Sequence, residues 1–443
     1  MLKKNKLYKG NVTQQGKLGE GIIVFDECPV YIPNTIPGDR VVFKLLKLEK
    51  RRAFGKLIEI LLSSPDRVSA PCSVAMQCGG CQLQHQSKDA QLGFKFNLLK
   101  SRLSRFIDID EIQFLPVLAN DVLWGTRNKM QFAFSNGSDG VAIGLYAHRS
   151  HRVIDFDYCH VMSSSMNQVV RAIKAWVNMN LVSVFDEHTG QGVLRHLTLR
   201  TSHVTGQIMI ILTLGDMFDM RSFVTAISQV AGVASIYVSV QSDKTNDQVM
   251  GDELHHIWGA LVIDDVVHGC KCQVSPKSFM QANGSLVNKL YKTVIDSVLP
   301  SDVILDLYCG TGVMTCALAK YFDHVVGVDN NVSAIEDAKR NAEENRVNVQ
   351  FFCEDVVNYI SNVSLGNATV ILDPPRQGCS EHVIKSLIQI QPKQIIYVSC
   401  YPDTLGRDLR AFTSNGFRVQ SVQAVDMFCH TPHVEAVAKL ELT

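Results

Sequence analysis

The sequence predicts an α/β protein of about three domains, with a parallel sheet covered by helices in its C-terminal part. The chain has 443 residues, which is too long for one ordinary core. Short apolar runs separated by Gly and Pro fill residues 1–60, and strand-like patterns dominate residues 127–270. After residue 285 strands and helices alternate, which is typical of a parallel sheet with helices on both faces.

The N-terminal segment is predicted to form a small β-barrel. Its apolar runs at 21–25, 30–32 and 40–45 are closely spaced and separated by turns. Residues 1–60 hold 12 Lys and Arg against 6 Asp and Glu, and the rest of the chain has a net charge of −6. This asymmetry is expected of a module that contacts nucleic acid, although a solvated basic face would give the same counts.

The composition also bears on where the protein works. No run approaches the roughly 18 consecutive apolar residues of a membrane helix, and the basic N-terminus lacks the apolar core of a signal peptide. We therefore expect a cytoplasmic protein without a membrane partner.

Between the barrel and the alternating region, a linker at 63–71 leads into a cysteine cluster, and residues 88–106 are predicted to be helical. Cys72, Cys78 and Cys81 are closely spaced, and Cys159 follows much later. Disulfides are the weaker interpretation in a reducing compartment. Three neighbouring thiols and a distant fourth predict a Cys₄ site for zinc or an iron–sulfur cluster, and the spacing does not choose between them.

The C-terminal region should form one open sheet. Strands are predicted at 303–307, 324–329, 349–353, 368–372 and 394–399, with helices at 313–322 and 333–345 and further helical stretches later. The last two strands, 417–426 and 434–442, have no helix between them. We expect them to form an antiparallel hairpin at one edge of the sheet.

A nucleoside site is predicted after the first two of these strands. In Asp306-Leu307-Tyr308-Cys309-Gly310-Thr311-Gly312 the two glycines let the backbone approach a ligand at the carboxyl end of the strands. Asp329 ends the second strand, where an acidic residue can hold ribose hydroxyls. Because a full G-x-G-x-x-G is missing, an adenosine with a short charged tail, such as S-adenosylmethionine, fits better than a dinucleotide. A plain strand-to-helix turn is the alternative.

Two further motifs end neighbouring strands. Asp373-Pro374-Pro375-Arg376 would hold a carboxylate at the same edge, as in enzymes that methylate a planar nitrogenous base. Cys400 stands after a strand and before a helix N-terminus, where we expect a lowered pKa. A thiolate can add to carbon 6 of uracil and make carbon 5 nucleophilic, and Glu435 could remove the carbon-5 proton. Taken alone, Cys400 would more often be a buried structural thiol, and its position after Asp373 in the same crevice reverses that preference.

Together these motifs resemble the bacterial RNA (uracil-5-)-methyltransferases, most closely the iron–sulfur branch that acts on large-subunit ribosomal RNA. The resemblance runs nearly end to end. It implies an OB-like TRAM β-barrel at 1–62, a mainly β central domain at 63–270, and a Rossmann-like S-adenosylmethionine-dependent methyltransferase domain at 271–443.

The resemblance also implies roles for individual residues. Ser278-Phe279-Met280-Gln281-Ala282-Asn283 looks like the family's S-F-x-Q-x-N segment, whose Gln contacts the bound ligands. The implied set is Cys400 as nucleophile, Glu435 as base, Gln281, Tyr308, Asp329 and Asp373 as cofactor-binding residues, and Cys72, Cys78, Cys81 and Cys159 as ligands of a [4Fe-4S] cluster. Asp355 is a weaker candidate for the adenine edge.

Two positions depart from the family pattern: Tyr401 replaces the Asn of S-C-N-P, and Cys429 stands where the family usually has Pro. The expected substrate is 23S ribosomal RNA, and the expected state is a monomer. The alternatives are the same reaction on transfer RNA and an RNA-binding ribosome assembly factor without activity. A small-molecule methyltransferase would leave the basic head and the cysteines unexplained.

Overall fold

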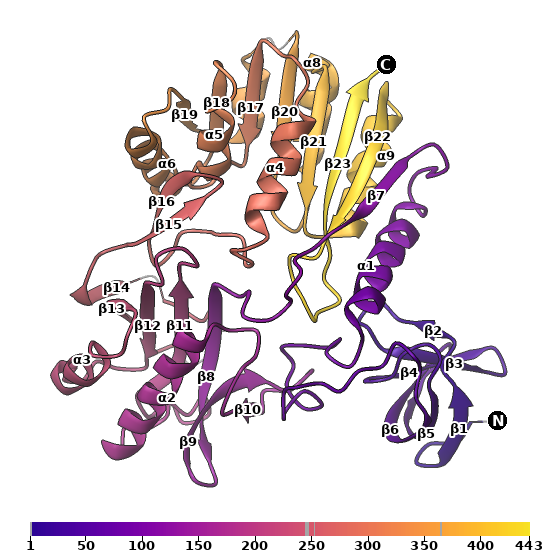
Figure 1. The fold of residues 1–443 in the computed structure, drawn as a ribbon, viewed down its shortest axis with the longest axis vertical. Coiled ribbons are helices and arrows are strands. Elements are labelled where there is room, and N and C mark those ends of the chain that lie inside the picture. The colour runs from indigo at the N-terminus through magenta and orange to yellow at the C-terminus, as the bar shows by residue number, and fades with distance from the viewer. Residues whose placement is uncertain (1, 244–247, 252, 364–365) are drawn as a thin grey trace.

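The computed structural model describes residues 2–243, 248–251, 253–363 and 366–443, and these form four sheets. Figure 1 shows a small N-terminal sheet, a central sheet and a large C-terminal sheet as three distinct bodies. In the part of the chain that the structure describes, no helix combines the length and the apolar character needed to cross a membrane.

The N-terminal sheet curves back on itself. Its strands are β1 (Leu7–Asn11), β2 (Gln14–Gln15), β3 (Gly21–Phe25), β4 (Cys28–Ile32), β5 (Arg40–Leu48) and β6 (Ala53–Leu62), in the order β1-β5-β6-β4-β3-β2. The first and last strands of this order are consecutive in the chain. Between them, Val12 donates to the Asp39 carbonyl at 2.8 Å and Thr13 to the Ile22 carbonyl at 3.1 Å. The arrangement is compatible with the expected barrel, around a core that includes Phe43.

The central sheet has seven strands in the order β10-β9-β8-β11-β12-β13-β14. These are β8 (Lys129–Gly137), β9 (Gly140–Tyr146), β10 (Val153–Asp155), β11 (Leu194–Thr201), β12 (Ile208–Leu214), β13 (Val233–Val240) and β14 (Leu254–Gly259). The mainly strand-like pattern expected over residues 127–270 is confirmed by these strands. Helices α2 (Ser164–Met179) and α3 (Arg221–Ile227) contribute to the same core.

The C-terminal sheet has the order β19-β18-β17-β20-β21-β23-β22-β7. Its strands after residue 300 are β17 (Val303–Leu307), β18 (Val325–Asp329), β19 (Gln350–Cys353), β20 (Ala368–Leu372), β21 (Gln394–Ser399), β22 (Phe417–Val425) and β23 (Glu435–Leu442). The helices around it are α4 (Val287–Ser297), α5 (Val313–Leu318), α6 (Val332–Asn345), α7 (Val356–Ser361), α8 (Glu381–Ile390) and α9 (Pro402–Thr413). Separate apolar clusters on its two faces complete the predicted α/β fold. A short hairpin, β15 (Ile263–Val267) and β16 (Cys270–Val274), leads into it.

The expectation that the last hairpin forms an edge of this sheet is wrong. Strand β7 (Gln113–Leu118) pairs in parallel with β22 and is itself the edge strand. Helix α1 (Lys88–Leu103) precedes it and buries Leu99 and Leu103 in the C-terminal core. Residues 88–118, which we assigned to the central domain, therefore pack with the C-terminal sheet, as Figure 1 shows. Without β7, the outer edge of β22 would have unpaired backbone N–H and C=O groups, and β7 pairs with them.

Candidate active site

The site is built at the point where the sheet order reverses. Strand β17 lies between β18 and β20, so the loops that follow these three parallel strands diverge around a crevice at their carboxyl ends. The turn after β17 carries the predicted glycine motif. At Gly312, with a φ of 69°, an added Cβ would lie 2.7 Å from Ala338 and from the Phe351 ring. Only glycine fits this turn without displacing α6 or β19.

The carboxylate of Asp329 is fixed by backbone groups on both sides of the crevice. Its Oδ2 accepts a hydrogen bond from the Gly310 N–H at 3.0 Å, and its Oδ1 accepts one from Asn331 at 2.9 Å. Asp306, at the end of β17, is buried and accepts a hydrogen bond from the Thr315 hydroxyl at 2.6 Å. Burial raises the pKa of Asp306 to about 7, because a charged carboxylate loses its hydration there.

Asp373 faces a residue contributed from the segment before α4. The Gln281 side-chain amide donates to Asp373 Oδ2 at 3.5 Å, and the Gln281 carbonyl accepts from the Asn128 side chain at 2.7 Å. Gln281 thus lies where the central body meets the C-terminal sheet. Burial raises the pKa of Asp373 above its usual range.

Cys400 and Glu435 are brought together by strand pairing. Strands β21 and β23 are antiparallel with Ser399 opposite Ala436, so Cys400 and Glu435 leave the same end of this pair. Glu435 is 2% exposed, and its Oε2 has no hydrogen-bond partner among the described residues. Burial raises the pKa of Glu435, and the nearby charge of Asp373 raises it further.

The lowered pKa expected for Cys400 is wrong. Burial raises the pKa of this thiol, the carboxylates of Glu435 and Asp373 raise it further, and the Arg376 guanidinium opposes them. The helix N-terminus that the sequence places after Cys400 is therefore outweighed by its surroundings. Near neutral pH the group is a thiol that must lose its proton to react.

Arg376 is a site residue for which the sequence suggested no role. Its guanidinium lies 5.4 Å from the Tyr401 ring centroid, and its Nη2 lies 3.5 Å from His433 Nδ1. The side chain is exposed at the mouth of the crevice. The Tyr401 that replaces the family Asn therefore supports a cation beside the nucleophile. The D-P-P-R motif itself contained the signal, since Arg follows Asp373 by three residues.

The four predicted ligand cysteines line one cavity of about 410 Å³, together with Arg127. Burial raises the pKa of Cys81 to about 11 and that of Cys159 to about 12. Within the described residues, no three or more His, Cys, Asp or Glu side chains are arranged to hold a metal ion. Such an arrangement would hold a single ion, whereas an iron–sulfur cluster is larger. Four thiols that line one cavity match the donor set of such an all-cysteine cluster.

Comparison with known proteins identifies the family. Residues 253–442 match the tRNA (uracil-5-)-methyltransferase family. An uncharacterized RNA methyltransferase of Halalkalibacterium halodurans is 36% identical, and the match covers 96% of this chain and 94% of that protein. A second from Listeria monocytogenes is 35% identical over 100% of this chain and 99% of its own length. The chain belongs to the RNA (uracil-5-)-methyltransferase family.

A solved structure agrees with this family. The tRNA (uracil-54, C5)-methyltransferase of Pyrococcus abyssi, in complex with S-adenosyl-L-homocysteine, has a TM-score of 0.81 and 30% sequence identity, covering 98% of this chain and 100% of that one. The predicted fold class, family and enzymatic character of this RNA methyltransferase are thereby confirmed.

The methyltransferase brings most of its predicted site residues to one crevice, and their roles remain predictions. Cys400, Glu435, Asp373 and Gln281 are linked by the contacts and charge interactions described above. Tyr308, in the turn after β17, has a φ of 66°. Asp355 caps α7 by accepting from Val357 at 2.9 Å, so one of its oxygens already has a structural partner. The cysteine cavity is separate.

Proposed function

We propose that this enzyme methylates carbon 5 of a specific uridine in RNA through a covalent bond to Cys400. The observation that carries the proposal is the pairing of Cys400 with Glu435 at the end of β21 and β23, beside Asp373. A nucleophile and a buried carboxylate with a raised pKa form the pair that such a substitution at carbon 5 requires.

Each bond change can be assigned to a residue of this pair. The Cys400 thiol passes its proton to the neighbouring Asp373 carboxylate and its sulfur bonds to carbon 6, while the electrons of the double bond between carbons 5 and 6 move to the carbon-4 oxygen as an enolate. S-adenosylmethionine, when bound, would supply an electrophilic methyl group; the enolate re-forms its carbonyl as carbon 5 bonds to that methyl group, and S-adenosylhomocysteine leaves. Glu435 then accepts the carbon-5 proton, the electrons of that bond restore the double bond between carbons 5 and 6, and the sulfur leaves as a thiolate.

The remaining predicted residues would bind the cofactor or the target base. Asp329, whose carboxylate accepts from two backbone N–H groups, would accept hydrogen bonds from ribose hydroxyls. Gln281 and Asp373 form a donor and acceptor pair that can hydrogen-bond a planar base or the cofactor. Tyr308, in the turn after β17, would contribute to the cofactor site. Because an uracil inside a helix is inaccessible to a thiolate, the target must leave its stack.

Covalent trapping tests the mechanism. Cys400→Ala should bind RNA and cofactor but transfer no methyl group. Glu435→Gln should methylate and then retain the RNA, because the carbon-5 proton cannot leave, and should accumulate an adduct that survives denaturation. The wild type should do the same on RNA that contains 5-fluorouracil.

The exposed Cys353 provides a matched control, and Cys353→Ala should retain normal turnover. Near-normal turnover in Cys400→Ala would show that the covalent route is wrong and that this thiol is structural.

For the substrate, we propose 23S ribosomal RNA before transfer RNA. Support comes from the resemblance of the basic head and the cysteine set to the ribosomal branch, whereas the Pyrococcus abyssi neighbour is named for transfer RNA. Mapping 5-methyluridine in ribosomal and transfer RNA from a strain that lacks the gene decides between them. Loss from transfer RNA alone would overturn the ribosomal assignment.

We further propose that Cys72, Cys78, Cys81 and Cys159 hold a [4Fe-4S] cluster, which would supply an iron-bound centre outside the catalytic crevice. Protein purified without oxygen should be brown and contain iron and sulfide, and Cys78→Ser should lose both. Cys28→Ser, which changes a cysteine of the N-terminal sheet, should keep them. Stoichiometric zinc without iron would contradict this assignment.

A further inference from the structure

The loop of residues 426–434, between β22 and β23, ends at Glu435 and is held against the segment that follows Cys81. The backbone N–H groups of Gln82 and Leu83 both donate to the His430 carbonyl, each at 2.9 Å. Cys81 lines the cysteine cavity. Two hydrogen bonds therefore join the cavity wall to the loop that leads directly into the predicted base.

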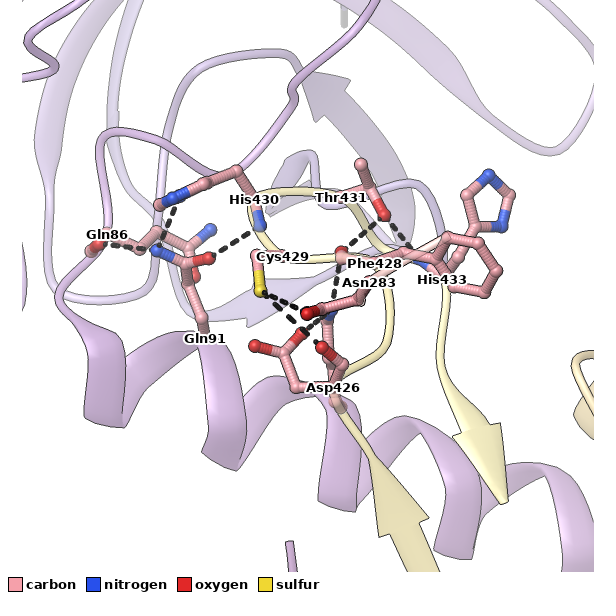
Figure 2. A network of polar contacts seen from close by, with 10 residues as sticks. Gln86, Gln91, Asn283, Asp426, Phe428, Cys429, His430, Thr431 and His433 are labelled. Atoms are coloured by element: carbon pink, nitrogen blue, oxygen red, sulfur yellow. Dashed lines mark hydrogen bonds and ion pairs between the residues drawn. The ribbon is translucent and has the colours of Figure 1, made fainter. Parts of the chain in front are cut away.

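The side chain of His430 is fixed on two sides. Its ring stacks on Trp124 with 3.7 Å between centroids and an interplanar angle of 16°. The His430 backbone N–H donates to Gln91 Oε1 at 3.2 Å, and Gln91 Nε2 lies 3.3 Å from His430 Nδ1, as Figure 2 shows. Burial lowers the pKa of His430 to about 4, so the neutral ring can accept at Nδ1. His430 is 2% exposed and has a φ of 62°.

Two other residues, Lys95 and Asn283, contact the start of the same loop. Lys95 on α1 forms a fully buried ion pair with Asp426 and donates to the Phe428 carbonyl at 2.9 Å. The Asn283 side chain, close in sequence to Gln281, lies 3.7 Å from Cys429 Sγ. Segments from three distant parts of the chain thus meet on a loop of nine residues.

Glu435 is held by strand pairing on its C-terminal side and by this loop on its N-terminal side. Its Oε2 has no hydrogen-bond partner in the described residues, so packing and the path of its backbone determine where the carboxylate lies. That backbone begins β23, opposite Val425, immediately after the loop. A catalytic group requires supporting contacts that hold it to within about 0.5 Å of its working geometry.

We propose that His430 is a positioning residue that aligns Glu435 for removal of the carbon-5 proton, by docking the 426–434 loop on Trp124, Gln91 and the Gln82–Leu83 backbone. The inference rests on the proposed function, because it assigns to His430 an effect on one step of that mechanism. Addition of Cys400 and methyl transfer do not require Glu435 to accept the proton. Loss of docking should therefore slow resolution of the adduct more than its formation.

The test measures adduct and turnover in His430→Asn, since Asn tolerates a positive φ but cannot stack on Trp124. We expect turnover to fall by roughly 10- to 100-fold, while the fraction of enzyme trapped on methylated RNA rises several-fold. Trp124→Ala should behave in the same way, and Trp124→Phe, which keeps an aromatic face, should stay near the wild type. His256→Asn is the matched control, because His256 is exposed on β14, far from the loop in sequence, and its ring also contacts an aromatic ring, that of Tyr237.

The outcomes are distinguishable from failure of the mechanism itself. If Glu435→Gln forms no adduct, the proposed function is wrong. The positioning role is wrong if Glu435→Gln traps RNA but folded His430→Asn shows wild-type turnover. It is also wrong if the fraction of His430→Asn trapped on RNA falls together with its turnover. Should His430→Asn not fold, Gln91→Met removes the two hydrogen bonds to His430, together with the one that the Gln91 amide donates to the Gln86 carbonyl, at similar volume, and the same readings apply to it.

Discussion

At the scale of residues, buried carboxyl groups dominate the crevice. Asp306, Asp373 and Glu435 all have raised pKa values, in each case chiefly because burial removes water from the charged form. Clustering like charges lowers the stability of the fold, and such clusters of carboxyl groups with shifted pKa values are typical of functional sites. For Glu435 the same burial makes the carboxylate a stronger base than an exposed one, which suits removal of a carbon-bound proton.

The charge of Asp306 should destabilise the fold at high pH. Its pKa of about 7 in the folded protein lies above the ordinary value of 3.8, so its favourable contribution is complete below pH 3.8 and is lost as the pH rises through 7. Asp306→Asn can still accept from Thr315 but carries no charge. We expect it to exceed the wild type in free energy of unfolding by on the order of 2 kcal/mol at pH 8, with no gain at pH 4. Urea denaturation at both pH values measures this, and an equal difference at both would contradict it.

At the scale of elements, α1 connects the C-terminal sheet to the 426–434 loop. The helix begins at the Ser87 cap, whose hydroxyl accepts from Ala90 at 3.2 Å, and it carries both Gln91 and Lys95. Lys95 and Asp426 are fully buried, Lys95 pairs with Asp426 Oδ1, and Asp426 Oδ2 has no hydrogen-bond partner in the described chain. A buried pair of this kind is costly to break from one side, because the remaining charge stays in a dry environment.

Removing one member of this pair should loosen α1. In Lys95→Met the Asp426 carboxylate is left unpaired, and the free energy of opening the helix should fall by about 3 kcal/mol. Hydrogen exchange of the α1 amides measures that opening. The double variant Lys95→Met/Asp426→Leu should recover much of the loss. If the double variant has the same free energy of opening of α1 as Lys95→Met, the unpaired charge is not what loosens the helix.

At the scale of the whole molecule, the N-terminal sheet and α1 enclose a groove of about 1440 Å³. Its walls carry Lys17, Arg105 and Arg149, and the stacked rings of Tyr31 and Phe54 lie 5.8 Å apart. The Arg149 guanidinium lies 6.0 Å from the Phe54 ring centroid, so the central body contributes to the same groove. Cations beside stacked aromatic rings favour single-stranded nucleic acid.

The groove cations should set the salt dependence of RNA binding. Replacing Lys17, Arg105 and Arg149 with Gln should weaken RNA affinity and reduce the slope of log Kd against log salt by about 0.7 for each lost phosphate contact. The affinity for S-adenosylmethionine should not change, because that crevice lies in the C-terminal sheet. Matched Gln substitutions of Lys292, Lys339 and Lys385, on helices α4, α6 and α8, serve as the control. An unchanged slope would place the RNA contacts elsewhere.

The sequence alone determined the features that depend on local order. Strand and helix periodicity is local, so the strands near 303–307, 368–372 and 394–399 were predictable to within a residue or so. Residues that end parallel strands of one sheet lie at the same edge of that sheet, so Asp329 and Asp373 could be assigned to one crevice before any coordinates. The cysteine spacing predicted a Cys₄ site, which stays a prediction, and the structure brings Cys159 and its distant partners to one cavity.

The tertiary structure decided what depends on distant segments. That β7 would pair with β22, and that α1 would pack on the C-terminal core, involves contacts between residues some 300 positions apart, to which periodicity is insensitive. The pKa of Cys400 was predicted with the wrong sign because a strand end and a helix start are visible in the sequence, whereas the burial of the thiol and the charges of Glu435 and Asp373 around it exist only once the sheet has formed. The docking of His430 on Trp124 belongs to the same class, because packing of side chains across domains is a property of the folded chain.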